Sequence, residues 1–410
     1  MEREKLDALA AEAEARIQPR FREIDRVAER NTKKLLTAFR DHRVSEACFA
    51  GSTGYGYDDL GRETLEKVFA QVFGTESALV RLGFQNGTHA ITCAIFAPLR
   101  TGDTLLLATG LPYDTLWSAL GVHDEKPGSL RSYGIGFRAV DLLPEGTPDF
   151  DAIEKAAADP KVKEVFIQRS RGYTTRGALS VETIDRIIDL VHAVNPKAVC
   201  VVDNCYGEFV EEREPRGDLL AGSLIKNPGG GLAPMGGYVA GKAELVEAAA
   251  FRLTVPGIGG EIGATLGQNR SLFQGLFMAP HTVAQALKTA VYAASLLELL
   301  GYRAFPSWDE RRSDIIQSVD FGDGELLRRF CAGIQHASPV DSYVTPEPWD
   351  MPGYDDPVIM AAGTFIQGAS IELSCDGPMR EPYTAYLQGG LTWEAGKLGI
   401  LTAVEELLKE

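Results

Sequence analysis

Short apolar runs alternate with amphipathic segments through the middle of this 410-residue chain. The segment Val181–Val194 repeats apolar side chains at helical intervals, which predicts an amphipathic helix. Runs without that period predict buried strands at residues 104–108, 164–168, 198–203 and 237–240. Continuous apolar strands separated by amphipathic helices predict an α/β fold, with a mainly parallel sheet covered on both faces. We expect functional residues at the carboxyl ends of these strands, where such folds bind ligands.

The two ends of the chain predict different structures. Residues 1–42 carry apolar side chains at helical intervals, which predicts two helices broken near Pro19. After Pro280 the pattern predicts a long helix over 281–300. Two strands of a smaller sheet are predicted at 358–365 and 369–373, and a closing helix at 394–408. We therefore expect three parts: an N-terminal helical segment over 1–45, a large domain over 46–285, and a small C-terminal domain over 286–410.

Composition excludes several classes of protein. The formal net charge of −16 argues against a protein that grips nucleic-acid phosphates. No stretch approaches the roughly 20 apolar residues that a membrane span needs, so we expect no membrane partner. The polar, acidic start resembles neither a secretory signal nor a transit peptide, and cytoplasm is the expected location. The six cysteines form no CxxC pair or zinc-like cluster, so we expect reduced thiols and no metal.

Two polar residues follow neighbouring apolar runs. Asp203 ends the run beginning at Ala198, and Lys226 follows the run beginning at Leu219. Taken singly, the aspartate could cap a helix or form a turn, and the lysine could be a packed structural residue. Glycines follow Lys226 and leave room for a ligand, and burial there would lower the lysine pKa, which favours attack on an aldehyde.

The pair favours one cofactor. A lysine that bonds to an aldehyde and an aspartate that faces a pyridine nitrogen are the two contacts that pyridoxal 5′-phosphate chemistry needs. Ser223, three residues before Lys226, could direct its hydroxyl toward the phosphate. The set Lys226, Asp203 and Ser223 therefore predicts a pyridoxal phosphate site.

An upstream turn fits the same ligand. Asn86, Gly87 and Thr88 open a predicted helix, and the free N–H groups of a helix start bind phosphate well. A plain glycine turn with a threonine cap is the structural alternative. Tyr113, in GLPYDTL, follows a predicted strand and could stack on a pyridine ring, although a tyrosine there could equally belong to the core.

In this order the motifs resemble a known family. The segments that carry the resemblance are GSTGYGYDDLGRETLE, FQNGTHAI, GLPYDTL, VVDNCYGEFVE, SLIKNPGGGLAPMGGYVAG and SIELSCDGPMREPYTAYLQGGLTWE. Together they resemble the fold-type I pyridoxal phosphate enzymes, and among these the cystathionine lyase and methionine γ-lyase-like proteins known as aluminium-resistance proteins. The resemblance covers the chain from about residue 20 to its end. It implies the aspartate aminotransferase fold, with a seven-stranded large domain and a smaller α+β domain.

The resemblance also implies roles for individual residues. Lys226 matches the lysine that carries the cofactor, Asp203 the partner of the ring nitrogen, and Tyr113 the stacking aromatic. Gly87 and Thr88 match the phosphate-binding turn.

Further positions match less closely. Tyr55, Tyr57 and Arg62 resemble a segment that related lyases donate to the neighbouring subunit's phosphate, although their spacing differs from the usual Tyr-x-Arg. For the substrate carboxylate we expect Arg380, with Arg169 and Arg171 as alternatives, because a guanidinium binds a carboxylate with two hydrogen bonds.

These relatives assemble as homotetramers built from dimers with shared active sites, so a homodimer and a homotetramer are expected. The implied reaction is β- or γ-elimination from a sulfur amino acid, giving a 2-oxo acid, ammonia and a thiol, with Tyr113 or the neighbour's Tyr57 as proton donor. Transamination, aldol cleavage and decarboxylation use the same cofactor and stay open. So does a pyridoxal phosphate-binding protein without turnover. The substrate itself is not fixed by these residues.

Overall fold

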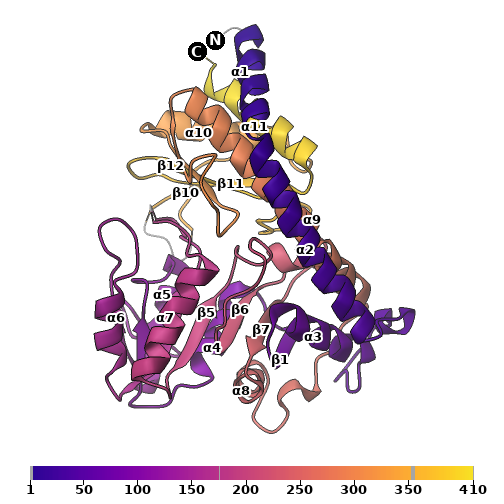
Figure 1. Ribbon diagram of the computed structural model, residues 1–410, viewed down its shortest axis with the longest axis vertical. Coiled ribbons are helices and arrows are strands. Elements are labelled where there is room, and N and C mark those ends of the chain that lie inside the picture. The colour runs from indigo at the N-terminus through magenta and orange to yellow at the C-terminus, as the bar shows by residue number, and fades with distance from the viewer. Residues whose placement is uncertain (1–2, 175, 352–355, 410) are drawn as a thin grey trace.

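The computed structural model describes residues 3–174, 176–351 and 356–409, and it contains two separate sheets, one for each half of the molecule (Figure 1). In this part of the chain the larger sheet has seven strands in the order β1-β7-β6-β5-β4-β2-β3. Strand β7 pairs antiparallel with both β1 and β6, and the remaining neighbours are parallel. The strands are β1 (Ser77–Arg81), β2 (Thr104–Leu107), β3 (Gly136–Ala139), β4 (Val162–Gln168), β5 (Val199–Asp203), β6 (Leu219–Ser223) and β7 (Gly237–Gly241).

Helices cover both faces of this sheet, which confirms the predicted α/β fold. Alternate residues of each central strand belong to different cores: Val165 and Ile167 pack into one, and Phe166 between them into the other. The first core contains α3 (Leu60–Phe73), α6 (Phe150–Ala157) and α7 (Val181–Val194). The second contains α4 (Gly87–Phe96), α5 (Asp114–Leu120) and α8 (Ala243–Leu253).

The smaller sheet is formed by the C-terminal part of the chain. Its described strands are antiparallel in the order β10-β11-β12-β9-β8. They are β8 (Arg303–Phe305), β9 (Gln317–Asp320), β10 (Val358–Ala361), β11 (Ser374–Pro378) and β12 (Thr384–Gln388). Helices α10 (Gly324–His336) and α11 (Trp393–Leu407) form a third core with one face of this sheet.

Of the three further described helices, two connect the two halves, and the one at the start of the chain packs into the third core. The predicted pair at the start of the chain is present as α1 (Arg3–Arg16) and α2 (Gln18–Asp41), and α2 packs along α9 (Asn269–Leu299) (Figure 1). Because α9 contributes to the first and the third core, the expected domain boundary between residues 285 and 286 falls inside it. Short 3₁₀ turns complete the description at Glu46–Phe49, Arg131–Tyr133, Asn227–Gly229 and Gly259–Glu261. None of the described helices is long and apolar enough to cross a membrane.

Three predicted elements differ from the structure. The strand predicted over 358–365 ends at Ala361, as β10. Helix α9 begins at Asn269 rather than after Pro280, because buried side chains such as Phe273 and Leu276 continue its apolar face upstream of the proline. The predicted strand over 369–373 is instead a turn. There the Glu372 carboxylate accepts hydrogen bonds from the backbone N–H groups of Phe365 and Ile366, and the strand begins only at Ser374.

Candidate active site

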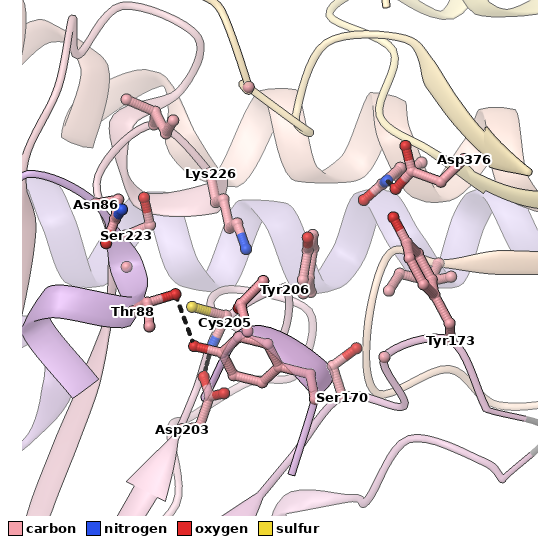
Figure 2. A pocket seen from close by; sticks show the side chains of 18 of the residues that line it. Asn86, Thr88, Ser170, Tyr173, Asp203, Cys205, Tyr206, Ser223, Lys226 and Asp376 are labelled. Atoms are coloured by element: carbon pink, nitrogen blue, oxygen red, sulfur yellow. Dashed lines mark hydrogen bonds between the residues drawn. The ribbon is translucent and has the colours of Figure 1, made fainter. Parts of the chain in front are cut away.

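A cavity of about 440 Å³ lies where the strands of the larger sheet end beneath the smaller sheet (Figure 2). The larger sheet and its connections supply Asn86, Gly87, Thr88, Tyr113, Gln168, Ser170, Tyr173, Asp203, Cys205, Tyr206, Ser223 and Lys226. The smaller sheet supplies Asp376, Tyr386 and Gln388. The expected location at the carboxyl ends of the parallel strands therefore agrees with the structure.

Lys226 enters the cavity from the connection that follows β6. Its Nζ atom lies 4.0 Å from the ring centroid of Tyr206 (Figure 2). Burial acts to lower the pKa of Lys226, but Tyr206 and Cys205 act in the opposite direction and hold it well above its ordinary value. The expectation of a lowered pKa is therefore wrong, because it considered burial without these polar neighbours.

Asp203 ends β5, the strand next to β6, and it is buried in the same cavity. Its Oδ1 atom accepts a hydrogen bond of 3.1 Å from the backbone N–H of Cys205 (Figure 2). Burial raises the pKa of Asp203, whereas Lys226 and the Cys205 N–H oppose that shift. A buried carboxylate in this position favours a ligand that brings a positive N–H group.

The start of α4 forms another wall of the cavity. Asn86 caps this helix by accepting a hydrogen bond of 2.8 Å from the His89 N–H. A Cβ atom at Gly87 would lie 3.0 Å from the Cβ of Ser223 and 3.5 Å from the Sγ of Cys205, so a larger residue would crowd this corner. Ser223 is buried, and its hydroxyl has no hydrogen-bond partner among the described residues. Helix N–H groups beside an unpaired hydroxyl fit a phosphate.

Tyr113 connects this corner to Asp203. Its hydroxyl donates a 3.0 Å hydrogen bond to Thr88, and its backbone N–H donates a 2.8 Å hydrogen bond to the Gln168 side chain. Burial and the nearby Asp203 carboxylate both raise the pKa of Tyr113. Its phenol therefore keeps its proton at neutral pH and can donate a hydrogen bond to a ligand.

Several lining residues were not predicted from the sequence. Tyr206 follows Asp203 by three positions within VVDNCY, so this motif offered a signal for it. In the structure its backbone is left-handed, with a φ of 69°. Asp376 and Gln388 lie in the quoted segment SIELSCDGPMREPYTAYLQGGLTWE, but neither follows a strand predicted for the larger sheet, and Tyr173 lies in none of the quoted segments. The first two lie on the smaller sheet, and their approach to Lys226 depends on how the two sheets pack.

The three arginines expected to bind a carboxylate lie outside the cavity lining. Arg380 donates hydrogen bonds to Asp356 at 3.1 Å and to the Tyr173 carbonyl at 2.9 Å. Arg171 is buried and donates to the Phe305 carbonyl and to Ser318. Arg169 is held in a separate network. Of the described residues that line the cavity, Lys226 is the only one with a cationic side chain.

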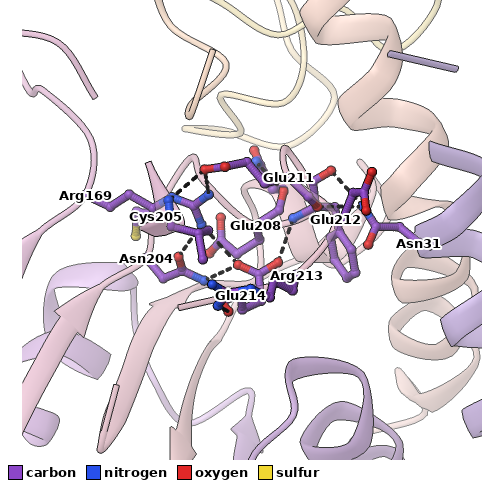
Figure 3. Close-up of polar contacts among 12 residues, drawn as sticks. Asn31, Arg169, Asn204, Cys205, Glu208, Glu211, Glu212, Arg213 and Glu214 are labelled. Atoms are coloured by element: carbon purple, nitrogen blue, oxygen red, sulfur yellow. Dashed lines mark hydrogen bonds and ion pairs between the residues drawn. The ribbon is translucent and has the colours of Figure 1, made fainter. Parts of the chain in front are cut away.

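That network holds the segment from Asn204 to Glu214, which directly follows Asp203 (Figure 3). Arg169 is fully buried, forms ion pairs of 3.1 Å with Glu211 and with Glu214, and donates to Asn204 at 2.7 Å. A Cβ atom at Gly207 would come within 2.3 Å of the Arg169 Nε atom, so the guanidinium occupies the space that glycine leaves. Arg169 therefore fixes the segment between Asn204 and Glu214 rather than contacting a ligand.

The segment expected to reach a neighbouring subunit is also outside this cavity. Tyr55 and Tyr57 are exposed, with ring centroids 5.6 Å apart. Arg62 is buried and donates to backbone carbonyls, including that of Gly263 at 2.9 Å. The two tyrosines are thus free to contact another molecule, whereas the arginine holds its own loop.

The chain matches the methionine gamma-lyase family over residues 6–408. An uncharacterised protein of Bacillus subtilis (strain 168), YnbB, is 53% identical over 411 residues, which cover 99% of this chain and 97% of that protein. The crystal structure of a carbon-sulfur lyase involved in aluminum resistance from Clostridium novyi NT matches with a TM-score of 0.95 and 50% identity, covering 99% of this chain and 96% of that chain.

A more distant structure shares the fold. The pyridoxal-5′-phosphate-dependent protein YhfS of Escherichia coli matches with a TM-score of 0.61 and 18% identity, covering 92% of this chain and 95% of that chain. The match to the family extends over nearly the whole chain and includes both sheets and the cavity between them. By this match the chain belongs to the methionine gamma-lyase family.

Proposed function

We propose that this protein is a pyridoxal 5′-phosphate-dependent carbon–sulfur lyase that acts on a sulfur amino acid. The observation that carries the proposal is the position of Lys226 in one cavity with the buried carboxylate of Asp203 and the unpaired hydroxyl of Ser223. A single lysine, a ring-nitrogen partner and a phosphate corner are the contacts that this cofactor requires. Membership of the methionine gamma-lyase family supports the same reaction.

Each wall of the cavity suits one part of the cofactor. Lys226 would bond to the aldehyde, and Asp203 would pair with the pyridine nitrogen. Gly87, Thr88 and Ser223 would hold the phosphate, with Asn86 fixing the start of α4. Tyr113 would lie against the ring. When bound, the cofactor withdraws electrons from the substrate α-carbon, which allows the bonds of that carbon to break.

The protein's own residues would move the protons. With cofactor and substrate bound, the Lys226 amine would serve as the base that takes the α-proton. The Tyr113 phenol carries a proton at neutral pH and lines the same cavity, so it is our candidate donor for the departing sulfur. The carbon–sulfur bond breaks, the thiol leaves, and water then replaces nitrogen. One thioether amino acid and one water thus give one thiol, one ammonia and one 2-oxo acid.

We also propose that the protein forms a homodimer with shared active sites, and that two dimers form a tetramer in the cytoplasm. The exposed tyrosines at positions 55 and 57 support a contact between subunits, since two large aromatic side chains are rarely left in water together. All six cysteines are buried and free, as in proteins of a reducing compartment. Light scattering would measure the mass, and Tyr57→Ala should reduce both the mass and the affinity for the cofactor.

Product analysis tests the reaction. The cofactor-loaded protein is incubated with cystathionine, methionine and S-alkyl cysteines, and thiol, ammonia and 2-oxo acid are measured together. Equal amounts of all three products support elimination. Formation of pyridoxamine phosphate without thiol would instead support transamination, and a loaded protein without any product from any amino acid would support a binding role.

A further inference from the structure

A second group of polar side chains lies at the opposite end of the larger sheet from the cavity. His192 belongs to the last turn of α7, Cys200 to the start of β5, and Asp218 directly precedes β6. These are the amino-terminal ends of β5 and β6, whereas Asp203 and Lys226 lie at their carboxyl ends. None of the three residues lines the cavity around Lys226. The group is therefore separate from the proposed cofactor site.

The three side chains converge on a small volume. The imidazole nitrogen, the sulfur and the carboxylate oxygen that they offer all lie within 4.8 Å of one another. The His192 Nε2 atom is 3.0 Å from the Asp218 Oδ2 atom, and the same oxygen accepts a 2.7 Å hydrogen bond from the Cys200 backbone N–H. A tetrahedral zinc ion holds such atoms about 3.4–3.6 Å apart, so shifts of about 1 Å would bring the three around one ion.

The group is buried on one side and open on the other. Cys200 is fully buried in the first core, and the Asp218 side chain is 4% exposed. The His192 side chain is 33% exposed, so it connects the group to solvent. Lys242, whose Nζ atom lies 2.6 Å from the Asp218 Oδ1 atom, is 51% exposed. A cation from solvent can therefore reach Asp218 by displacing the lysine ammonium, and water can supply the fourth ligand.

The types of ligand atom select the metal. Thiolate sulfur and imidazole nitrogen bind zinc strongly, and a carboxylate oxygen is a third ordinary zinc ligand. Magnesium and calcium instead take oxygen ligands, of which this group offers only one carboxylate. Sulfur, nitrogen and oxygen ligands together therefore favour Zn²⁺ over these two ions.

Exchange of the lysine for zinc keeps the charge of the group balanced. Burial and the Asp218 carboxylate raise the pKa of the Cys200 thiol, so the structure holds a neutral thiol beside an Asp218–Lys242 ion pair. Zn²⁺ would displace the thiol proton, and its two positive charges would be matched by the Cys200 thiolate and the Asp218 carboxylate. The Lys242 ammonium would return to solvent. The buried group therefore carries no net charge in either form.

We propose that His192, Cys200 and Asp218 form a zinc-binding site that ties the end of α7 to the starts of β5 and β6. This proposal replaces the expectation that the protein binds no metal. The sequence offered no motif for the site, because His192 and Asp218 are 26 positions apart. The ion would stabilise the two strands that lead to Asp203 and Lys226 without taking part in the reaction.

Metal titration of the cofactor-loaded protein, freed of metal by a chelator, tests the site. Calorimetry should give one Zn²⁺ per chain, and Co²⁺ should produce a thiolate-to-cobalt charge-transfer band in the difference spectrum. Cys200→Ser should remove this band and weaken zinc binding by at least about tenfold, since even the loss of a ligand's hydrogen-bond partner has such an effect. Cys93→Ser, which changes a buried cysteine of α4, should alter neither result.

A second variant tests the exchange with the lysine. Lys242→Gln removes the ammonium that competes for Asp218, so zinc should bind about two- to fivefold more tightly, the range expected for an exposed ion pair. Lys155→Gln removes the same charge from the exposed face of α6 and should leave the affinity unchanged. A zinc ion bound elsewhere on the surface would not distinguish these two variants.

Thermal denaturation separates folding from binding. Zinc should raise the melting temperature of wild type, but not that of Cys200→Ser, and circular dichroism verifies that each variant folds. If the buried substitution prevents folding, His192→Ala, at a partly exposed position, should weaken zinc binding in the same way. The proposal is overturned if wild type binds no zinc, if zinc binds Cys200→Ser or His192→Ala as tightly as wild type, or if Lys242→Gln leaves the affinity unchanged.

Discussion

The Lys226 ammonium lies 4.0 Å from the ring centroid of Tyr206, and the Tyr206 hydroxyl forms a hydrogen bond with the same lysine. Tyr206 reaches this position through a left-handed backbone with a φ of 69°, which non-glycine residues seldom adopt. The Arg169 network fixes the segment on which it lies (Figure 3). Burial acts to lower the pKa of Lys226, and among the neighbours that raise it Tyr206 has the largest effect.

Tyr206→Phe should lower the pKa of Lys226, because it removes the hydroxyl and keeps the ring. A lysine with a lower pKa has more free amine at a given pH, so the pH midpoint for covalent attachment of pyridoxal phosphate should fall by about one unit or more. Attachment is measured by borohydride trapping across a pH series. Tyr386→Phe, which changes another lining tyrosine outside the main influences on Lys226, should leave the midpoint unchanged. Equal midpoints for Tyr206→Phe and wild type would contradict this account.

Ser223→Ala should have opposite effects on stability and on cofactor affinity. Its hydroxyl is buried without a partner, so its removal should leave the ligand-free protein as stable as wild type or more stable. The same change should weaken pyridoxal phosphate binding by about tenfold, since one phosphate contact is lost. Thermal denaturation of the ligand-free protein and a cofactor titration measure the two effects. Unchanged affinity would remove Ser223 from the phosphate site.

Asp203→Asn should load with cofactor but react slowly. The asparagine oxygen can still accept the hydrogen bond from Cys205, whereas the negative charge that pairs with the ring nitrogen is lost. We expect kcat to fall by about 100-fold or more, in the range found when a group that stabilises developing charge is removed. The rate is normalised to the amount of cofactor fixed by borohydride. A variant with wild-type turnover would show that Asp203 has a structural role only.

Glu208→Gln should change how stability depends on pH. Burial raises the pKa of Glu208 to about 8, and its Oε1 atom accepts a 2.8 Å hydrogen bond from Tyr238. Between about pH 4.5 and 8 the unfolded carboxyl is ionised while the folded one keeps its proton, so the wild-type unfolding free energy falls as pH rises. The glutamine variant does not lose stability in this way. Its unfolding free energy should exceed that of wild type by on the order of a few kcal/mol at pH 8, and the two proteins should be similarly stable at pH 5. The assignment would be contradicted if the difference in unfolding free energy between the two proteins were the same at pH 5 and at pH 8.

The sequence predicted the part of the site that depends on local order along the chain. Asp203 and Lys226 follow adjacent parallel strands, and strand ends that meet at one edge bring such residues together. Asp376 and Gln388 could not be predicted in this way, because their position depends on the packing of one sheet on another. For the same reason the sequence suggested Arg380 as a carboxylate ligand, whereas its guanidinium pairs with Asp356 outside the cavity.

Errors in the fold have similar causes. Pro280 predicted a helix start, because a proline inside a helix removes one backbone hydrogen bond. In the structure the buried apolar face of α9 nevertheless extends upstream of Pro280. The apolar residues at 369–373 read as a strand, yet Glu372 uses its carboxylate to close a turn with Phe365 and Ile366. Side-chain hydrogen bonds of this kind leave no periodic pattern in a sequence.

The most direct test of the account is the site of cofactor attachment. Wild-type protein and Lys226→Ala are incubated with pyridoxal 5′-phosphate, reduced with borohydride and digested, and the peptides are analysed by mass spectrometry. The account predicts one modified peptide in wild type, with the cofactor on Lys226, and no modified peptide in the variant. Equal modification of both proteins, or a wild type that takes up no cofactor, would contradict the claim that Lys226 is the centre of this active site.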